Sequence, residues 1–221
     1  MKTGIFTLLL LALFTLPQYS QAQQQGDEER VPLFGAKKSK DKKEKEDDSA
    51  YLAGAIPVVN GEVCFSQTFA SKLNKEEMAE ALKDWAEKTF VPQEASLARQ
   101  ATSPGILSFD AAQGKLKIQG DEYIIFKNKP LVLDQTRIYY TLSVDCSDGS
   151  CSVTMSRIFY DYNDTQSEET IPRIKAENQI TDEYALRKNG TKLVRGTGTK
   201  FRVRTIDLKN KLFAQIQSVV E

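Results

Sequence analysis

The sequence predicts an α+β fold in which a single curved antiparallel sheet of about five strands carries two helices on one face. Segments that alternate apolar and polar residues are joined by turns too short for a crossover, so consecutive strands run antiparallel. Two further segments have apolar residues at helical spacing, and each apolar stripe needs a surface to be buried against. One face of the sheet provides that surface. The predicted order along the chain is β-α-β-β-β-β-α.

Five segments have the pattern of strands. In GEVCFSQTF (61–69), Val63, Phe65 and Phe69 fall on one side. The other four segments follow the first helix, with turn sequences at 111–114 and at Asp148-Gly149. These four are ILSFD (106–110), KLKIQGDEYIIF (115–126), RIYYTLSVDC (137–146) and CSVTMSRIFYDY (151–162).

Both predicted helices are amphipathic. The first begins at Asn74, where Glu77 completes a capping-box pattern, and it ends before Val91-Pro92. The second covers the C-terminus from Ile206, and Phe201 on the same face indicates a start one turn or more earlier. The apolar stripes comprise Met78, Ala81, Leu82, Trp85 and Thr89 in the first helix, and Leu208, Leu212, Phe213, Ile216, Val219 and Val220 in the second.

The N-terminus has the features of a secretory signal. Residues 5–16 form an uncharged apolar run after an early lysine, and Ser20-Gln21-Ala22 offers small residues where cleavage requires them. The run is shorter than the roughly 20 residues of a membrane-spanning helix. We therefore expect a signal peptide (1–22, cleaved after Ala22), a charged disordered linker (23–50) and one folded domain (51–221), located in the periplasm or secreted.

The composition disfavours several function classes. Thirty basic and thirty acidic residues give a formal charge of zero, which does not indicate a nucleic-acid binder. The chain has no histidine, so Ser-His and Cys-His nucleophilic mechanisms are not available. Three cysteines without histidine are a poor basis for a soft metal site. We expect no cofactor, no metal ion and no transmembrane segment after signal cleavage, and we interpret KKSKDKKEKEDD (37–48) as a solvated spacer, with a tether to anionic surfaces as the alternative.

Several strings of the domain, taken in order, resemble one bacterial family. They are YLAGAIPVVNGEVCFSQTF, DEYIIF, RIYYTLSVDCSDGSC, ITDEYAL and TKFRVRTIDLKNKLF. Over roughly residues 51–220 the chain is similar to an exported family, domain of unknown function 4468, whose fold is described as like one repeat of the TATA-binding protein (TBP-like). The resemblance implies that fold but no activity, because the family has no assigned catalytic or binding residues and fold does not imply function. Cys64 departs from the family pattern, which has an aliphatic residue there.

Cys146 and Cys151 flank Asp148-Gly149, which predicts a two-residue type I′ turn. In that register Cys146 faces Cys151 in the closer, non-hydrogen-bonded kind of pair, with Cα atoms about 4.5 Å apart. In an oxidising compartment we expect a disulfide that adds about 2 kcal/mol and fixes the register. Free thiols and redox or metal chemistry are the alternatives, although catalytic dithiols use C-x-x-C at a helix start.

Residues 187–206 have the strongest local charge bias of the predicted domain, with seven basic residues and no acid. They suggest a surface patch for anionic lipid head groups, a polysaccharide or an acidic protein. The alternative is an exposed connection whose charges prevent edge pairing and keep the domain soluble. The candidate patch consists of Arg187, Lys188, Lys192, Arg195, Lys200, Arg202 and Arg204.

Other candidates for chemistry are weaker. Acidic pairs at Asp121-Glu122 and Asp182-Glu183 would suit a carboxylate-dependent hydrolase acting on glycans, but adjacent acids are expected by chance in this composition. Cys64 is interpreted as a small packing residue rather than a reactive thiol. We therefore favour a non-catalytic binding or interaction module of the cell envelope, whose partner is an anionic envelope component or another envelope protein. An envelope hydrolase and a purely structural envelope component are the alternatives.

Overall fold

The computed structural model describes residues 48–92, 103–129, 132–161, 173–194 and 196–221, all within one compact unit, Lys45–Glu221. The predicted signal peptide and nearly all of the predicted linker lie outside the described residues. Within the described ranges, no helix combines the length and the apolar character that a membrane span requires.

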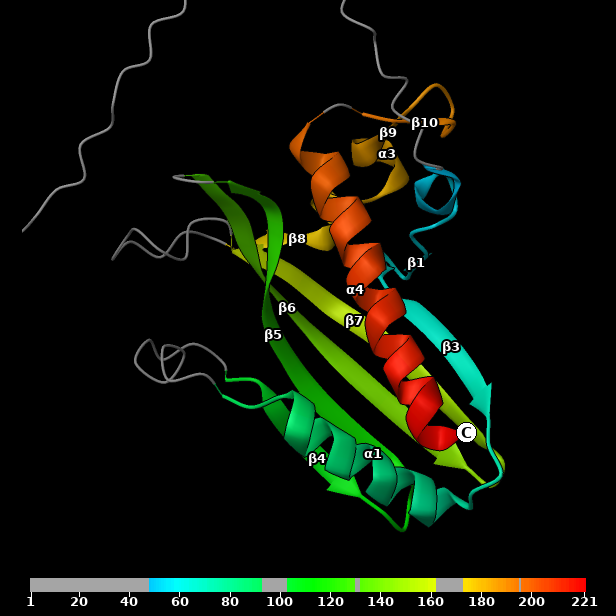
Figure 1. The fold of residues 1–221 in the computed structure, drawn as a ribbon. Helices are drawn as coiled ribbons and strands as arrows, with labels where there is room; N and C mark the ends of the chain where they lie inside the picture. Colours follow the sequence, from blue (N-terminus) through cyan, green and yellow to red (C-terminus); the bar gives the residue numbers. More distant parts are fainter. Residues whose placement is uncertain (1–47, 93–102, 130–131, 162–172, 195) are drawn as a thin grey trace, which may run out of the picture. The chain divides into compact units, whose positions relative to one another are not determined.

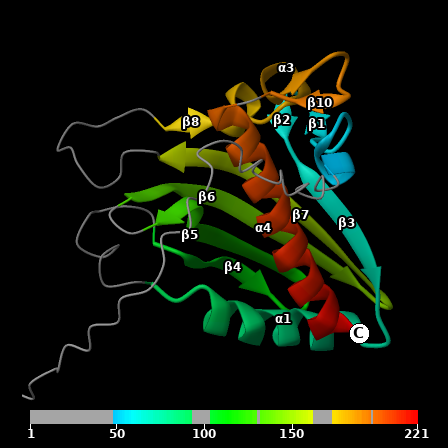
Figure 2. The same ribbon diagram turned by 45° about the horizontal axis from the view of Figure 1, so that its top comes forward.

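An antiparallel sheet with five main strands forms the centre of this unit, in the order β3-β7-β6-β5-β4 (Figure 1). The strands are β3 (Phe65–Ala70), β4 (Gly105–Asp110), β5 (Lys115–Lys129), β6 (Val132–Ser147) and β7 (Ser150–Asp161). A two-residue strand, β8 (Ile174–Lys175), pairs with the end of β7. The two long helices, α1 (Lys75–Thr89) and α4 (Thr197–Val220), cover one face of the sheet (Figure 2). The predicted fold class and order of main elements are confirmed.

Helix α1 begins as the sequence predicts. Asn74 Oδ1 accepts the Glu77 N–H at 2.9 Å, and Glu77 Oε2 accepts the Asn74 N–H at 3.2 Å, so both halves of the capping box are present. Thr89 is exposed, although the stripe pattern placed it on the apolar face. Phe90 at the C-cap is buried instead, with its ring 5.5 Å from the ring centre of Trp85.

Helix α4 is long enough to cross the whole sheet (Figure 2). It starts at Thr197, more than two turns before Ile206, which agrees with the early start that Phe201 indicated. Phe201 is buried against two rings of the sheet, with its centroid 4.9 Å from that of Phe126 and 4.7 Å from that of Tyr160. These aromatic contacts fix the first half of α4 on β5 and β7.

Strand alternation gives the sheet two different faces. The helix-covered face is apolar and includes Ile138, Leu142 and Val144 of β6. The opposite, open face of β3 and β7 carries hydroxyl side chains in cross-strand pairs. Ser66 Oγ lies 3.0 Å from Thr154 Oγ1, and Thr68 Oγ1 lies 2.8 Å from Ser152 Oγ. Such hydroxyl pairs add modestly to the register of the two strands.

The hairpin between β6 and β7 has the predicted register, with Ser147 opposite Ser150 and Cys146 opposite Cys151. Its turn is not type I′, because only Gly149 has a positive φ (79°) and a type I′ turn needs two such residues. The reason lies outside the hairpin: Asp148 Oδ1 accepts the Lys75 N–H of α1 at 3.0 Å. The turn is therefore docked on the start of α1.

The remaining helices and strands of the domain are short and lie near the N-terminal end of α4 (Figure 1). Two of them are two-stranded hairpins, β1 with β2 and β9 with β10. The elements are η1 (Asp48–Tyr51), β1 (Val58–Val59), β2 (Glu62–Val63), η2 (Ala176–Asn178), α3 (Asp182–Ala185), β9 (Leu186–Arg187) and β10 (Lys192–Leu193).

Candidate anion-binding groove

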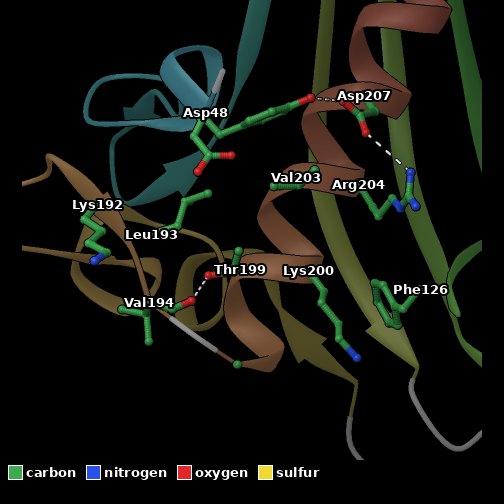
Figure 3. Close-up of a pocket in the computed structure, with 12 residues that line it drawn as sticks. Asp48, Phe126, Lys192, Leu193, Val194, Thr199, Lys200, Val203, Arg204 and Asp207 are labelled. Carbon is green, nitrogen blue, oxygen red and sulfur yellow. Dashed lines mark hydrogen bonds and ion pairs between the residues drawn. The ribbon is translucent and has the colours of Figure 1, made fainter. Parts of the chain in front are cut away.

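A groove of about 770 Å³ lies beside the first half of α4 (Figure 3). Its lining comes from three parts of the chain that are far apart in the sequence: η1, the end of β5, and the β10 region with the first half of α4 that follows it. The long helix positions its residues one turn apart along the groove, and the short elements bring the chain from both ends of the domain to the same place. The groove is therefore a product of the tertiary fold.

Three cations of the predicted basic segment line this groove. Lys192 is exposed and has no ion pair among the described residues. Lys200 Nζ lies 2.7 Å from Asp134 Oδ2, and Arg204 Nη1 lies 3.7 Å from Asp207 Oδ2. Both cationic side chains are about half exposed, so these ion pairs contribute little to stability.

Apolar side chains lie next to these charges. Phe126, Leu193 and Val203 all line the groove (Figure 3). Lys200 Nζ is 5.6 Å from the centre of the Phe126 ring, close enough for a weak cation–π contact. The groove thus offers an apolar surface next to exposed positive charge.

Tyr51 and Asp207 connect η1 to α4 inside the groove. The Tyr51 hydroxyl donates to Asp207 Oδ1 at 2.7 Å. This hydrogen bond, with burial and the negative charge of Asp207, raises the pKa of the Tyr51 phenol. Arg204 lies near the other carboxylate oxygen, so the charge of Asp207 is partly compensated. Asp48 is the second acid of the lining.

Arg202 corrects the predicted surface patch, because its side chain is fully buried. Its guanidinium donates to three backbone carbonyls at 2.7 Å each: Nε to Tyr51, Nη2 to Leu52 and Nη1 to Ile180. Nη2 also lies 2.8 Å from Asp182 Oδ1. Five fixed donors satisfy several acceptors at once, which suits arginine and no other side chain. Arg202 therefore holds η1 on α4 and keeps Tyr51 in the groove.

The remaining basic residues do not line the groove itself. Arg187 and Lys188 are exposed at the β9–β10 hairpin, where they line a separate hollow of about 250 Å³ together with Lys192 and Leu193. Arg195 lies outside the described residues. Of the seven predicted patch residues, the structure brings three into the groove and buries one.

The predicted disulfide is not present in the structure. Cys146 and Cys151 are both free, and their Sγ atoms are 3.7 Å apart, in contact but well beyond a bond of about 2.05 Å. Both thiols are buried in the helix-covered face. The hydrogen bond with Cys146, together with burial, raises the pKa of the Cys151 thiol. In this structure a backbone ladder and close packing keep the pair together, without a covalent bond.

The acidic pairs are engaged in structural contacts. Alternation along β5 sends Asp121 and Glu122 to opposite faces of the sheet. Asp121 forms a buried ion pair with Arg137, and Glu122 Oε1 accepts the Tyr140 hydroxyl at 2.6 Å. Asp182 binds the Gly54 N–H at 3.1 Å as well as Arg202. Asp121 and Glu122 are thus separated by the sheet, and Asp182 is bound to the backbone and to Arg202, whereas Glu183 is exposed.

Two further observations concern metal and thiol chemistry. Among the described residues, no group of three or more cysteines and acids is arranged to hold a metal ion. Cys64 is half-buried at the start of β3, and its Sγ lies 3.9 Å from Ser66 Oγ.

Sequence reasoning missed most of the groove. Tyr51, Phe126 and Asp207 had no signal in the sequence that connects them, because they come together only when η1 and β5 both pack on α4. The run of basic residues at 187–206 was the one signal in the sequence. It predicted the cations of the groove but not the other residues that line it.

Comparison with known proteins places this domain among relatives of unknown function. The profile of the domain of unknown function (DUF4468) with TBP-like fold matches residues 65–161. The crystal structure of a DUF4468 family protein from Bacteroides ovatus is 32% identical, covers 80% of this chain and 96% of its own, and superposes with a TM-score of 0.68. A TBP-like protein from Parabacteroides distasonis, 20% identical, covers 75% of this chain and 96% of its own with a TM-score of 0.57, which shows the shared fold. No curated protein matches. On the identity and coverage of the Bacteroides ovatus protein, the chain belongs to the DUF4468 family, whose fold is TBP-like.

Proposed function

We propose that this protein is a binding module of the cell envelope, and that its groove holds an anionic envelope component that also carries an apolar group. The observation that carries the proposal is that Lys192, Lys200 and Arg204 line one groove together with Phe126 and other apolar side chains. Small-molecule sites commonly combine an apolar lining with a few convergent polar groups.

The chemistry of recognition follows from the ion pairs already present. Lys200 and Arg204 each have an acidic neighbour within the protein, so they are held near the groove before a ligand arrives. A phosphate or carboxylate that approaches Lys200 or Arg204 would replace the half-exposed ion pair of that side chain with a stronger, charge-assisted hydrogen bond. Lys192 offers a third positive charge. An acyl chain or a sugar ring of the same ligand would cover Phe126, Leu193 and Val203.

Adsorption to lipid vesicles tests this proposal. The triple variant Lys192→Glu, Lys200→Glu and Arg204→Glu should lose binding to phosphatidylglycerol vesicles at low salt, while neither protein binds phosphatidylcholine vesicles. High salt should weaken binding of the unmodified protein, because exposed charges are screened. An acidic polysaccharide, used in place of the vesicles, distinguishes a lipid from a glycan as the anionic component.

A matched control separates the groove from net charge. Lys72→Glu, Lys117→Glu and Lys211→Glu change the charge by the same amount at three exposed positions that do not line the groove. This control should retain most of the binding. If both triple variants lose vesicle binding equally, or if adsorption does not respond to salt, the groove is not the binding site.

Export is part of the same proposal and is supported by the features of residues 1–22. It predicts that the protein isolated from its own cells begins at Gln23 and partitions with the periplasmic or extracellular fraction. Intact mass measurement of the native protein checks the first point. A mass that includes residues 1–22, or recovery with the cytosol, would contradict export.

A further inference from the structure

Among the residues that the structure describes, no strand pairs with the outer edge of β3. β3 is the last strand of the sheet, and within the described residues its ladder partner is β7 alone. Both ribbon views show β3 along the outer side of the sheet, with no described segment running beside its length (Figures 1 and 2).

The register fixes which backbone groups point outward from β3. Ser147 and Ser150 flank the two-residue turn, so their backbone groups bond to each other across the β6–β7 ladder. The next residue of β7, Cys151, therefore directs its N–H and C=O away from β6 and toward Phe69 of β3. Phe65, Gln67 and Phe69 therefore bond to β7, and the residues between them point away from it. Cys64 confirms this alternation, because its N–H donates outward to the Pro57 carbonyl at 3.1 Å.

The outward residues of β3 are Ser66, Thr68 and Ala70, which present three N–H and three C=O groups along the edge. At one end, the segment whose outward groups have no partner among the described residues stops before Cys64, because the Cys64 N–H already bonds to the Pro57 carbonyl. At the other end, Ser71 turns back, and its N–H bonds to the Gly149 carbonyl at 2.9 Å. The edge thus offers a straight segment of five residues, 66–70.

This edge lacks the features with which proteins usually prevent strand pairing. Such features are charged side chains, proline, bulges and covering elements. Residues 66–70, SQTFA, contain neither charge nor proline, and their register with β7 is regular. The opposite edge of the sheet differs: β4 has a register shift between Ile106 and Ser108, ends in Asp110, and lies beside α1.

We propose that two copies of this protein associate through their β3 strands, antiparallel about a two-fold axis at Thr68. Thr68 then faces Thr68 of the second copy, and Ser66 faces Ala70 of the second copy. All three are hydrogen-bonded pairs, so the six outward groups of each edge are satisfied at once. The side chains suit this arrangement because residues 66–70 carry no charge, so no like charges meet where Thr68 faces its own copy or where Ser66 faces Ala70.

The open face of the sheet supports a second copy as the occupant. The hydroxyl row that links Ser152 to Thr68 at 2.8 Å would continue across the axis to Thr68 and Ser152 of the second copy. The two sheets would form one continuous surface of paired hydroxyl groups. A peptide strand of another protein would meet the same backbone groups but would not reproduce this symmetric row.

Cysteine cross-linking tests the register directly in the Cys64→Ser background. Thr68→Cys should form a covalent dimer on mild oxidation, because the two Cα atoms on the axis are about 5.5 Å apart, within disulfide range. Ser66→Cys is the matched control: the two copies of residue 66 are separated by roughly 14 Å along the paired strands and should not cross-link. A mixture of Ser66→Cys protein with Ala70→Cys protein should cross-link again.

Sedimentation equilibrium of the purified protein provides the second measurement. The unmodified protein should dimerise with rising concentration, and Thr68→Lys should weaken dimerisation by about fivefold or more, because like charges meet at the axis. Ser108→Lys, on the β4 edge, should have no effect. A monomer at all concentrations overturns the proposal, and so does a dimer that cross-links equally through Ser66→Cys or is insensitive to Thr68→Lys.

Discussion

Replacing Arg202 by methionine tests whether this buried cation holds the two ends of the domain together. The change keeps an unbranched side chain of similar length but removes all donors. Three carbonyls, those of Tyr51, Leu52 and Ile180, then lose a charge-assisted hydrogen bond. Such a bond is worth about 1.5–3 kcal/mol, but water can reach the partly exposed Tyr51 and Leu52 and recover part of the loss. The ion pair with Asp182 is lost as well; that side chain is 44% exposed, but its contacting atom, Oδ1, is shielded from solvent.

These contributions predict a loss of about 4 kcal/mol in the free energy of unfolding. With a slope of about 2 kcal/mol per molar urea, the midpoint of urea unfolding should fall by about 2 M. The fluorescence of Trp85 in α1 reports the global transition. Arg204→Met removes the same charge two residues away on an exposed side chain and should shift the midpoint by less than about 0.3 M. A shift below about 0.5 M for Arg202→Met would refute the reasoning, because the three hydrogen bonds would then not stabilise the native state.

Three further predictions concern the sheet. Gly120→Ala should lower the free energy of unfolding by about 2 kcal/mol, since a Cβ there would lie 2.2 Å from the Tyr140 ring; an unchanged thermal midpoint would show that the ring can move at no cost. Asp121→Ala should cost about 3–5 kcal/mol in urea unfolding because it leaves Arg137 charged and buried, and a loss below about 1 kcal/mol would show that water reaches this pair. Burial raises the pKa of the Tyr140 and Tyr160 phenols, so the folded protein holds these protons more tightly than the unfolded chain does. That stabilisation is complete below the unfolded pKa of about 10 and is lost as pH rises through the higher folded values, so stability should decline above pH 10, and less steeply in Tyr160→Phe.

Local patterns were sufficient to predict the main elements. Asn74 and Glu77 define the start of α1 without help from distant residues, because a capping box joins groups three positions apart. The pairing of Cys146 with Cys151 likewise follows from a two-residue turn and the period of a strand. The turn type was wrong because Asp148 binds the backbone of α1, a contact that depends on how the hairpin and the helix pack.

The predictions of site residues were less accurate than those of the main elements. Whether a side chain is buried, and which groups it bonds to, depends on tertiary contacts that a local pattern does not contain. Arg202 belongs to a run of basic residues, and the run gives no indication that three carbonyls from η1 and the segment after η2 converge on this position. The groove shows the same limit. Its cations come from one stretch of sequence, but Tyr51 and Phe126 reach it from elsewhere in the chain.

The attachment of η1 to α4 has a consequence for when the groove exists. Tyr51 lies near the start of the domain and Asp207 near its end, so a ribosome must release almost the entire polypeptide before the two residues can meet. Incomplete chains that end before α4, and fragments that begin after η1, should therefore lack the complete groove even where the sheet has formed. A ligand bound in the proposed site would stabilise the docking of η1 on α4 and so reduce fraying at the N-terminal end of the domain, because it favours the state in which Tyr51 and Asp207 are joined.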